Sequence, residues 1–211
     1  MEILYLNEVD STHTYLKNYI KENGFKNPVA VVTQNQTNGI GSRTNSWEGK
    51  TGNLFLSFVM NKSVLPLDLP LQSSSIYFSY ILKDILNSLD SQVWLKWPND
   101  FYIENKKIGG TITNLSGELI YCGIGLNLYK VNNQFGHLDI SINLNKVLNI
   151  YFQKLESKIS WKHIFSKYSI EFEKSRQMET TINNQKKSLE HSMLNSDGSI
   201  FIDKEKVFSL R

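Results

Sequence analysis

The side chains best suited to chemistry lie in two short segments, Lys96-Trp97-Pro98-Asn99-Asp100 and Lys107-Ile108-Gly109-Gly110. The proline ends a buried strand in a fixed bend, and paired glycines inside a strand indicate that a backbone or a ligand comes close. Lysine ammonium groups attract an anion, and a carboxylate beside them can orient or remove a proton. The two segments together predict a site for an anionic ligand, although a hairpin with surface lysines would explain either segment taken alone.

A polar loop at residues 34–52 is the second candidate, because loops this long are usually functional or disordered. Its glycines alternate with small polar residues and expose backbone N–H groups that can surround an anion. Arg43 adds a permanent charge suited to phosphate, and Trp47 offers a flat face on which a base could stack. The loop lacks both the Walker pattern and the Rossmann glycine pattern. It favours a nucleotide site, with a simple linker as the alternative.

The elements that must position these segments alternate between strands and helices. Apolar runs predict strands at residues 3–6, 28–33, 53–60, 93–95, 101–103, 108–113 and 118–128. Helices are predicted from the capping residues Asp10-Ser11-Thr12 to Gly24, and over residues 71–89, 145–157 and 160–175. Short strands around a turn at residues 195–198 follow. We therefore expect a mixed α+β domain over residues 1–176 and a small β domain over residues 177–211.

Composition and charge argue against several classes of protein. The 211 residues carry a net charge of +3 without a basic run, which does not favour nucleic-acid binding. The four histidines lack the spacing of a zinc site, so no structural metal is expected. The single Cys122 favours a reducing compartment. Because no apolar run approaches the length of a membrane span and no signal-peptide pattern is present, we expect a cytoplasmic protein without membrane contact.

Four segments resemble, in the same order, the motifs of biotin–protein ligases. Residues 10–17 resemble the N-terminal motif of that family, and residues 36–47, with Gly52-Asn53-Leu54 and Ser57 after them, its glycine-rich ligand loop. Residues 96–100 and 107–110 are close to its most specific signature, and Gly123-Ile-Gly-Leu-Asn127 is similar to its adenine-side strand. The resemblance covers about residues 3–175, and the tail looks like a trimmed SH3-like domain.

The resemblance implies a class II synthetase-like catalytic domain, an α+β fold with a mixed sheet flanked by helices. Since the sequence starts at the catalytic domain, a monofunctional enzyme without a DNA-binding module is expected. Departures lie mainly in the glycine-rich loop, where Ile40, Ser42 and Asn45 stand at positions of the family's arginines and Arg43 alone remains. His13 replaces the usual asparagine of the first motif and is left out of the predicted site.

The implied reaction activates biotin with ATP to biotinyl-5′-AMP, releases pyrophosphate, and transfers biotin to a lysine of a biotin carboxyl carrier domain. Lys107 would screen the repulsion between the biotin carboxylate and the α-phosphate, and Asp100 would orient or deprotonate the acceptor lysine. Mg²⁺ would bind mainly through the phosphates, near Asn99. The residues implied for biotin are Ser11, Thr12, Gln36, Gly39 and Gly110. The residues implied for the nucleotide are Arg43, Trp47, Asn99, Lys107 and Asn127.

Two other functions stay open at this stage. A lipoate– or octanoate–protein ligase shares the fold, but this sequence lacks the Arg-Arg/Gly-Gly-Gly pattern with a nearby His-Asp that is typical of such enzymes. A non-enzymatic protein that holds biotin or the acceptor domain is supported only by the loop with few arginines. Ser11 and Thr12 also fit a simple helix cap, and Asn127 also fits a strand end. The resemblance allows a monomer or a homodimer.

Overall fold

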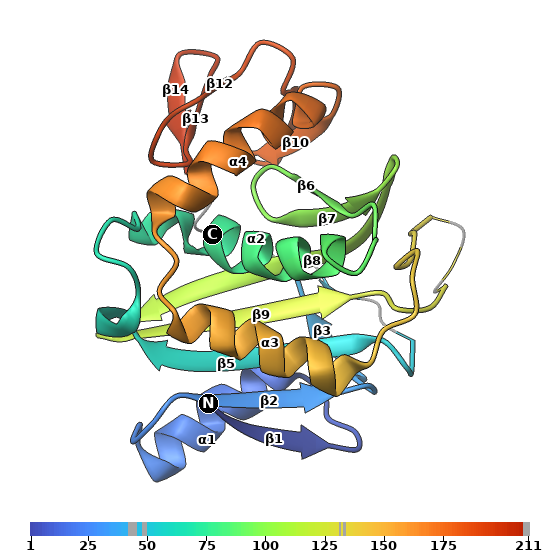
Figure 1. Cartoon of the computed structure of the whole chain (residues 1–211), viewed down its shortest axis with the longest axis vertical. Helices are drawn as coiled ribbons and strands as arrows, with labels where there is room; N and C mark the ends of the chain where they lie inside the picture. The colour runs from blue at the N-terminus through green and yellow to red at the C-terminus, as the bar shows by residue number, and fades with distance from the viewer. Residues whose placement is uncertain (42–45, 48–49, 131, 133, 209–211) are drawn as a thin grey trace.

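A single mixed sheet forms the centre of the molecule, in a computed structural model that describes residues 1–41, 46–47, 50–130, 132 and 134–208. In order across the sheet, its seven strands are β1 (Glu2–Leu6), β2 (Val29–Thr33), β5 (Leu54–Asn61), β9 (Leu119–Leu126), β8 (Lys106–Ser116), β7 (Asp100–Ile103) and β6 (Trp94–Lys96) (Figure 1). Strands β1 and β2 are parallel, and all other neighbours are antiparallel. The mixed sheet predicted from the sequence is therefore confirmed.

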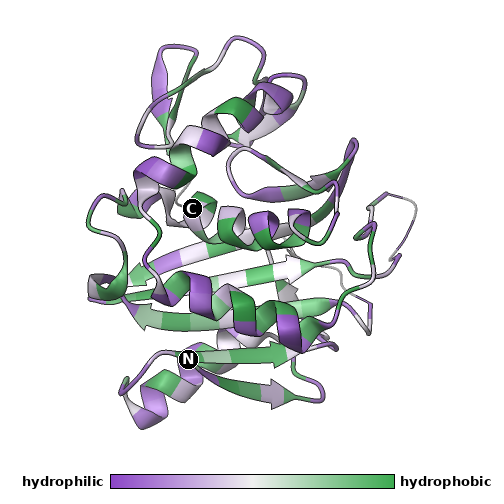
Figure 2. Cartoon of the chain, viewed as in Figure 1, coloured by the Kyte–Doolittle hydropathy of each residue, from purple (hydrophilic) through white to green (hydrophobic). Residues whose placement is uncertain are grey.

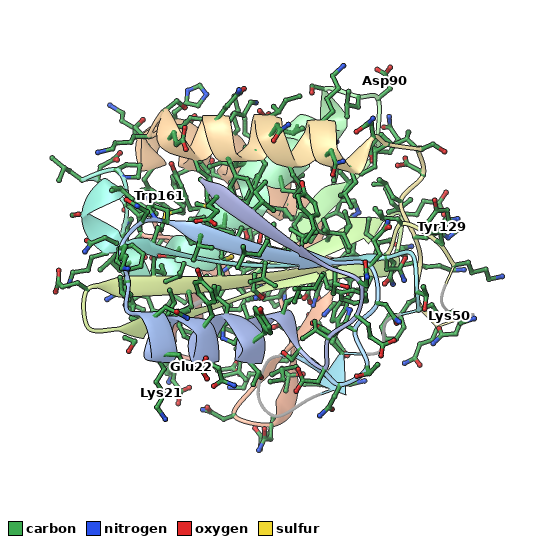
Figure 3. All side chains as sticks on the ribbon, turned by 90° about the horizontal axis from the view of Figure 1, so that it is seen from below. Lys21, Glu22, Lys50, Asp90, Tyr129 and Trp161 are labelled. Atoms are coloured by element: carbon green, nitrogen blue, oxygen red, sulfur yellow. The ribbon has the colours of Figure 1, made fainter. Side chains whose placement is uncertain are left out.

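Helix α1 (Thr12–Asn23) connects the two parallel strands and covers one face of the sheet. The hydroxyl of Ser11 accepts a hydrogen bond from the backbone N–H of Thr14 at 3.4 Å and so caps the helix. Gly24 ends the helix with a φ of 71°, a conformation that glycine adopts without a steric penalty. Figure 3 shows α1 against the sheet, with Lys21 and Glu22 pointing away from it.

The opposite face carries the larger core. Helices α2 (Ser74–Asn87) and α3 (Leu144–Glu156) pack there, and α4 (Trp161–Ser175) contacts α2 and β6. Figure 3 shows α3 on the side of the sheet opposite α1, and Figure 2 shows the central strands rich in hydrophobic residues. The rings of Phe58 and Phe78 meet edge to face at 5.1 Å between centroids. The short helices η2 (Lys62–Val64) and η3 (Leu71–Ser73) lie between β5 and α2.

Two small antiparallel sheets follow α4, at the top of Figure 1. The first pairs β10 (Glu179–Ile182) with β11 (Gln185–Ser188), and the second contains β12 (Met193–Leu194), β13 (Ile200–Ile202) and β14 (Glu205–Val207). The indole N–H of the buried Trp97 donates to the carbonyl of Gly198 at 2.9 Å, which ties this tail to the first chemical segment. A domain boundary at residue 176 stays a prediction.

The predicted elements lie close to the observed ones, and the structure adds short elements that the sequence analysis does not predict. Inside the expected loop, β3 (Gly39–Ile40) pairs with β4 (Ser46–Trp47) in a short antiparallel ladder. Among the helices of the described residues, none combines the length and hydropathy that a membrane crossing requires.

Candidate functional site

A cavity of about 400 Å³ opens on the α1 side of the sheet. That volume lies within the range of small-molecule sites. Its walls come from the start of α1, the segment after β2, strands β4, β5, β7, β8 and β9, and the segment after β9. The predicted site residues that line it are Ser11, Thr12, Gln36, Trp47, Asn99, Asp100, Lys107, Gly110 and Asn127.

Glycines make the floor of the cavity flat. Gly123 and Gly125 are two residues apart on β9 and so face the same side of the sheet. Gly125 pairs with Gly110 of β8, which extends the floor sideways. Because a strand rises about 3.3 Å per residue, the two positions on β9 lie roughly 7 Å apart. Two regions of the cavity, one near Gly123 and one near Gly125, therefore follow each other along strand β9.

The region near Gly125 and Gly110 is charged. Asp100 pairs with Gly110, and its Oδ1 lies 2.7 Å from the Nζ of Lys107. Its Oδ2 lies 3.8 Å from the Nζ of the buried Lys96, which faces it across β6 and β7. Two cations thus flank one carboxylate at the edge of the floor, an arrangement that attracts a second anion.

A β-bulge brings Lys107 to this region. The pairing of β7 with β8 shifts between Phe101 and Tyr102, so that Tyr102 faces Lys107 although Phe101 faces Gly109. The extra residue, Ile108, turns Lys107 onto the face that carries Gly110. As a result, a Cβ on Gly110 would lie 3.7 Å from the Nζ of Lys107. The glycine at this position keeps the space in front of the lysine open.

The region near Gly123 is neutral and polar. The hydroxyl of Thr12 lies 2.9 Å from that of Ser57 and 3.2 Å from Oε1 of Gln36. The backbone N–H of Thr12 donates to the same Oε1 at 2.9 Å. Gln36 reaches this place because the chain after β2 pairs with the chain after β1, through the bridge of Val9 with Gln36. Hydroxyl and amide groups held in this way suit an uncharged polar ligand group.

His13 closes the neutral end of the cavity, although it was left out of the predicted site. It is buried, and its Nε2 lies 3.0 Å from Oδ1 of Asn114. Burial, followed by the charge of Lys17, lowers the pKa of His13 from 6.5 to about 4. The imidazole is therefore neutral at pH 7.

Trp47 covers the charged end. A Cβ on Gly125 would lie only 2.7 Å from Cε2 of the indole, so the ring rests on this glycine. The Nζ of Lys107 lies 5.8 Å from the ring centroid, within the range of a cation–π contact. Within the described part of the chain, the buried indole Nε1 has no hydrogen-bond partner. The indole of Trp47 can therefore replace some of its contacts with the protein by contacts with a ligand.

Two asparagines complete the lining. The amide of Asn99 donates to the carbonyl of Thr111, and the amide of Asn127 donates to the carbonyl of Gly136 at 3.2 Å. The buried Oδ1 of Asn127 has no partner among the described residues and can accept a hydrogen bond from a ligand. Asn127 directly follows β9 and lies beyond Gly125, so its amide stands at the end of the strand next to the charged region.

Among the described residues of the predicted site, Gly39 does not line the cavity. Gly39 lies behind the wall, where a Cβ would approach the Trp47 carbonyl to 2.5 Å and Nε2 of Gln36 to 2.6 Å. Its lack of a side chain lets these two residues pack. Arg43 lies outside the described residues.

The predicted site residues do not include His13, Ser57, Gly123 or Gly125, although the last three lie in segments that resemble family motifs. Signals for three of them were present: Ser57 is a hydroxyl in an apolar run, and the two glycines recur with the period of a strand. His13 was set aside because it departs from a family pattern. Its ring is oriented by Asn114, a hydrogen-bond partner 101 residues away in sequence.

Comparison with known proteins agrees with this geometry. The model of the biotin/lipoate A/B protein ligase family matches residues 5–127. The bifunctional ligase/repressor BirA of Escherichia coli is 30% identical over 127 residues, which cover 57% of this chain and 38% of that protein. BirA of Bacillus subtilis is 29% identical over 111 residues, 50% of this chain and 34% of that protein. The matches thus span well under half the length of these curated relatives.

Solved structures cover the chain more fully. The biotin acetyl coenzyme A carboxylase synthetase of Helicobacter pylori, with bound biotinylated ATP, is 36% identical with a TM-score of 0.92, over 98% of this chain and 99% of that chain. The biotin protein ligase of Aquifex aeolicus, in complex with biotin and ATP, shares the fold at 21% identity and a TM-score of 0.76, over 100% and 96% of the two chains. With the family match and the Helicobacter pylori structure taken together, this chain belongs to the biotin/lipoate A/B protein ligase family.

Proposed function

We propose that the protein is a biotin–protein ligase, which activates biotin with ATP and transfers it to a lysine of a biotin carboxyl carrier domain. The observation that carries the proposal is the division of one cavity into a neutral polar end and a charged end. Biotin has the same division, with an uncharged ureido ring at one end and a carboxylate at the other. The relatives named above are ligases or a synthetase, and of the two solved structures one contains biotinylated ATP and the other biotin and ATP.

In the first step a carboxylate oxygen of biotin attacks the α-phosphorus of ATP. The new bond is the acyl–phosphate C(O)O–P bond, and the bond between the α-phosphorus and the bridging oxygen breaks to release pyrophosphate. Two anions must meet for this to happen, so the barrier contains a large electrostatic part. Lys107 lies beside the open space over Gly110 and supplies the positive charge. Its pairing with Asp100 at 2.7 Å fixes the direction of the ammonium group before substrates arrive.

In the second step the amine of the acceptor lysine attacks the acyl carbon. An amide bond forms, AMP leaves with the electron pair of the broken acyl–phosphate bond, and the amine loses a proton. Asp100 is 20% exposed at its side chain, which keeps it within reach of an incoming amine. We assign it the orientation of that amine and the acceptance of its proton.

The nucleotide occupies the end near Trp47 and Asn127 in this proposal. The indole face stacks on the adenine, and the unpartnered Oδ1 of Asn127 accepts a hydrogen bond from the exocyclic amine of the base. Among the described residues, no group of three or more His, Cys, Asp or Glu side chains is suited to a metal ion. A Mg²⁺ ion would be held mainly by the phosphate oxygens together with Asn99, and it would neutralise the charge of the phosphates.

The alternative of a lipoate or octanoate ligase is disfavoured by the neutral polar end, which would face an apolar ring or chain. The binder alternative is disfavoured by the charged end, because a protein that only holds biotin has no need of three converging charges. A cytoplasmic location is part of the proposal, since the reaction consumes ATP and the single Cys122 is a free, buried thiol.

The test is pyrophosphate exchange into ATP with purified protein and Mg²⁺, in parallel with biotin, lipoate and octanoate. The proposal predicts exchange that depends on biotin alone. Exchange with lipoate or octanoate in place of biotin would assign the neighbouring activity, and no exchange with any of the three would favour the binder. A second assay measures incorporation of labelled biotin into an isolated biotin carboxyl carrier domain and into a variant without its acceptor lysine.

A further inference from the structure

His13 carries one ring nitrogen that the protein leaves unused. Nδ1 is buried and has no hydrogen-bond partner within the part of the chain that the structure describes. The residue is 6% exposed and lines the cavity. A Cβ placed on Gly123 would lie 3.5 Å from Nδ1. A ligand atom that rests on this part of the floor is therefore in contact with the unused nitrogen.

The other ring nitrogen decides what Nδ1 can do. Oδ1 of Asn114 can only accept, so the ring proton lies on Nε2, which donates over 3.0 Å. Nδ1 is then a bare acceptor. The neighbours that face the ring are Lys17 on the same helix and the neutral Tyr121 on β9, whose ring lies edge-on at 6.4 Å. A second proton on the imidazole is opposed by burial and by Lys17, so the acceptor persists at pH 7.

We propose that His13 is a specificity-determining residue, whose Nδ1 accepts a hydrogen bond from a ring N–H of the ligand head group. The inference rests on the proposed function and adds a residue to it. Thr12 and Gln36 face the same end of the cavity and serve the remaining polar atoms of the head group. The ligand class is a cyclic urea or amide with an N–H donor.

This contact separates the chemically related acids. The ureido ring of biotin carries N–H donors, whereas the dithiolane ring of lipoate and the chain of octanoate carry none. A site built to hydrogen-bond a polar group rejects analogues that lack it, because its own buried group then stays unpaired. With lipoate bound, Nδ1 would remain buried without a donor.

His13 could also act only by fastening α1 to the sheet through Asn114. Two substitutions separate these roles because each keeps one of the two nitrogen positions. In His13→Asn the amide stands near the place of Nδ1 and the link to Asn114 is lost. In His13→Gln the amide reaches the place of Nε2 and the group near Gly123 is lost. Exposed His163 on α4 offers the same chemical change outside the cavity, as His163→Gln.

The experiment is calorimetric titration of the full chain and of these variants with biotin, together with biotin-dependent pyrophosphate exchange at saturating biotin. Folding is checked by thermal unfolding. The proposal predicts that His13→Gln weakens biotin binding about tenfold, with a much smaller change in the exchange rate at saturation. It predicts that His13→Asn binds biotin at least fivefold more tightly than His13→Gln, and that His163→Gln matches the parent.

The reverse order, with His13→Asn the weaker binder, would overturn the proposal in favour of a fastening role. Equal affinities for the parent and His13→Gln would overturn it as well. If both variants unfold early, the parent's preference for dethiobiotin over an analogue methylated at the ring nitrogens decides, and no preference would contradict the proposal. Failure of the proposed function is recognised separately, because the parent itself would then show no biotin-dependent exchange.

Discussion

The two ends of the cavity are built in different ways. At the neutral end, Thr12, Gln36 and Ser57 bond to one another and offer hydroxyl and amide groups. At the charged end, Asp100 is held between Lys107 and Lys96. The same strand, β9, passes beneath both and keeps them about two residues apart. In the proposed function the neutral end selects a head group and the charged end lowers a barrier, so variants at the two ends should change different kinetic parameters.

The largest effect on activity is expected from a substitution at the charged end of the cavity. Lys107→Ala removes the charge that we propose screens the two reacting anions, and pyrophosphate exchange at saturating substrates should fall by about 100- to 1000-fold. Lys106→Ala, an exposed lysine on the same strand, should leave exchange close to that of the parent. An unchanged maximal rate with Lys107→Ala, and only a raised KM for biotin, would make this end a binding element like the other.

The next effect concerns the neutrality of the other end. The pKa of His13 is lowered in the folded protein, from 6.5 to about 4, by burial and by Lys17. The unfolded chain therefore takes up a proton as the pH falls through 6.5 while the folded chain does not, and stability is lost between pH 6.5 and pH 4. The loss from this one group approaches about 3 kcal/mol at the acid limit.

Urea unfolding of the parent and His13→Asn from pH 7.5 to pH 4.5 measures this loss. Carboxylates titrate in both proteins, so the difference between the two free energies of unfolding isolates His13. That difference should shift in favour of the variant as the pH falls. A difference independent of pH would show that the imidazole accepts a proton in the folded state as easily as in the unfolded chain.

A methyl group added to the floor of the cavity tests whether its two ends contact different parts of the ligands. Gly125→Ala places a Cβ 2.7 Å from Cε2 of Trp47, and Gly123→Ala places one 3.1 Å from Ile112 and 3.5 Å from His13. Inserting a methyl into filled space typically costs about 1–3 kcal/mol, or roughly tenfold in affinity at the lower values. Gly123→Ala should raise the KM for biotin alone, and Gly125→Ala should raise it for both biotin and ATP. Equal effects of the two variants on the KM for both substrates would contradict the division of the cavity into a neutral end and a charged end.

The smallest effect tests a single hydroxyl. Thr12→Val keeps the shape of the side chain and removes the contacts with Ser57 and Gln36. Since one hydrogen bond contributes about 1 kcal/mol, the KM for biotin should rise about fivefold with little change in the maximal rate. Thr14→Val, two residues further along α1 and not part of the cavity lining, is the matched control. A fall in the maximal rate without a change in KM would place Thr12 with the reacting groups.

Local patterns were enough to predict much of the fold. The alternation of apolar residues indicated the strands, and Ser11 and Gly24 marked the ends of α1 because capping depends on neighbours in sequence. The candidate residues Lys107, Asp100 and Thr12 were also found from local motifs, and the structure brings them to one cavity. Their roles remain predictions until the variants are measured.

Features that depend on distant partners could not be predicted in this way. The bulge that turns Lys107 toward Gly110 appears only when β7 pairs with β8. The contact of Trp97 with Gly198 joins residues 101 positions apart, and the chemical state of His13 depends on Asn114. Sequence motifs thus identified many of the side chains that line the cavity, while the long-range pairing determines how these side chains are oriented.

The division of the cavity is tested most directly by exchanging the ends of the ligand. Calorimetry without ATP would compare biotin with biotinamide, which keeps the head group and loses the charge, and with octanoate, which keeps the charge and loses the head group. We expect biotinamide to bind about tenfold more weakly than biotin, the equivalent of one charge-assisted hydrogen bond, and octanoate to give no measurable heat. Octanoate binding as tightly as biotin, together with no binding of biotinamide, would contradict the account.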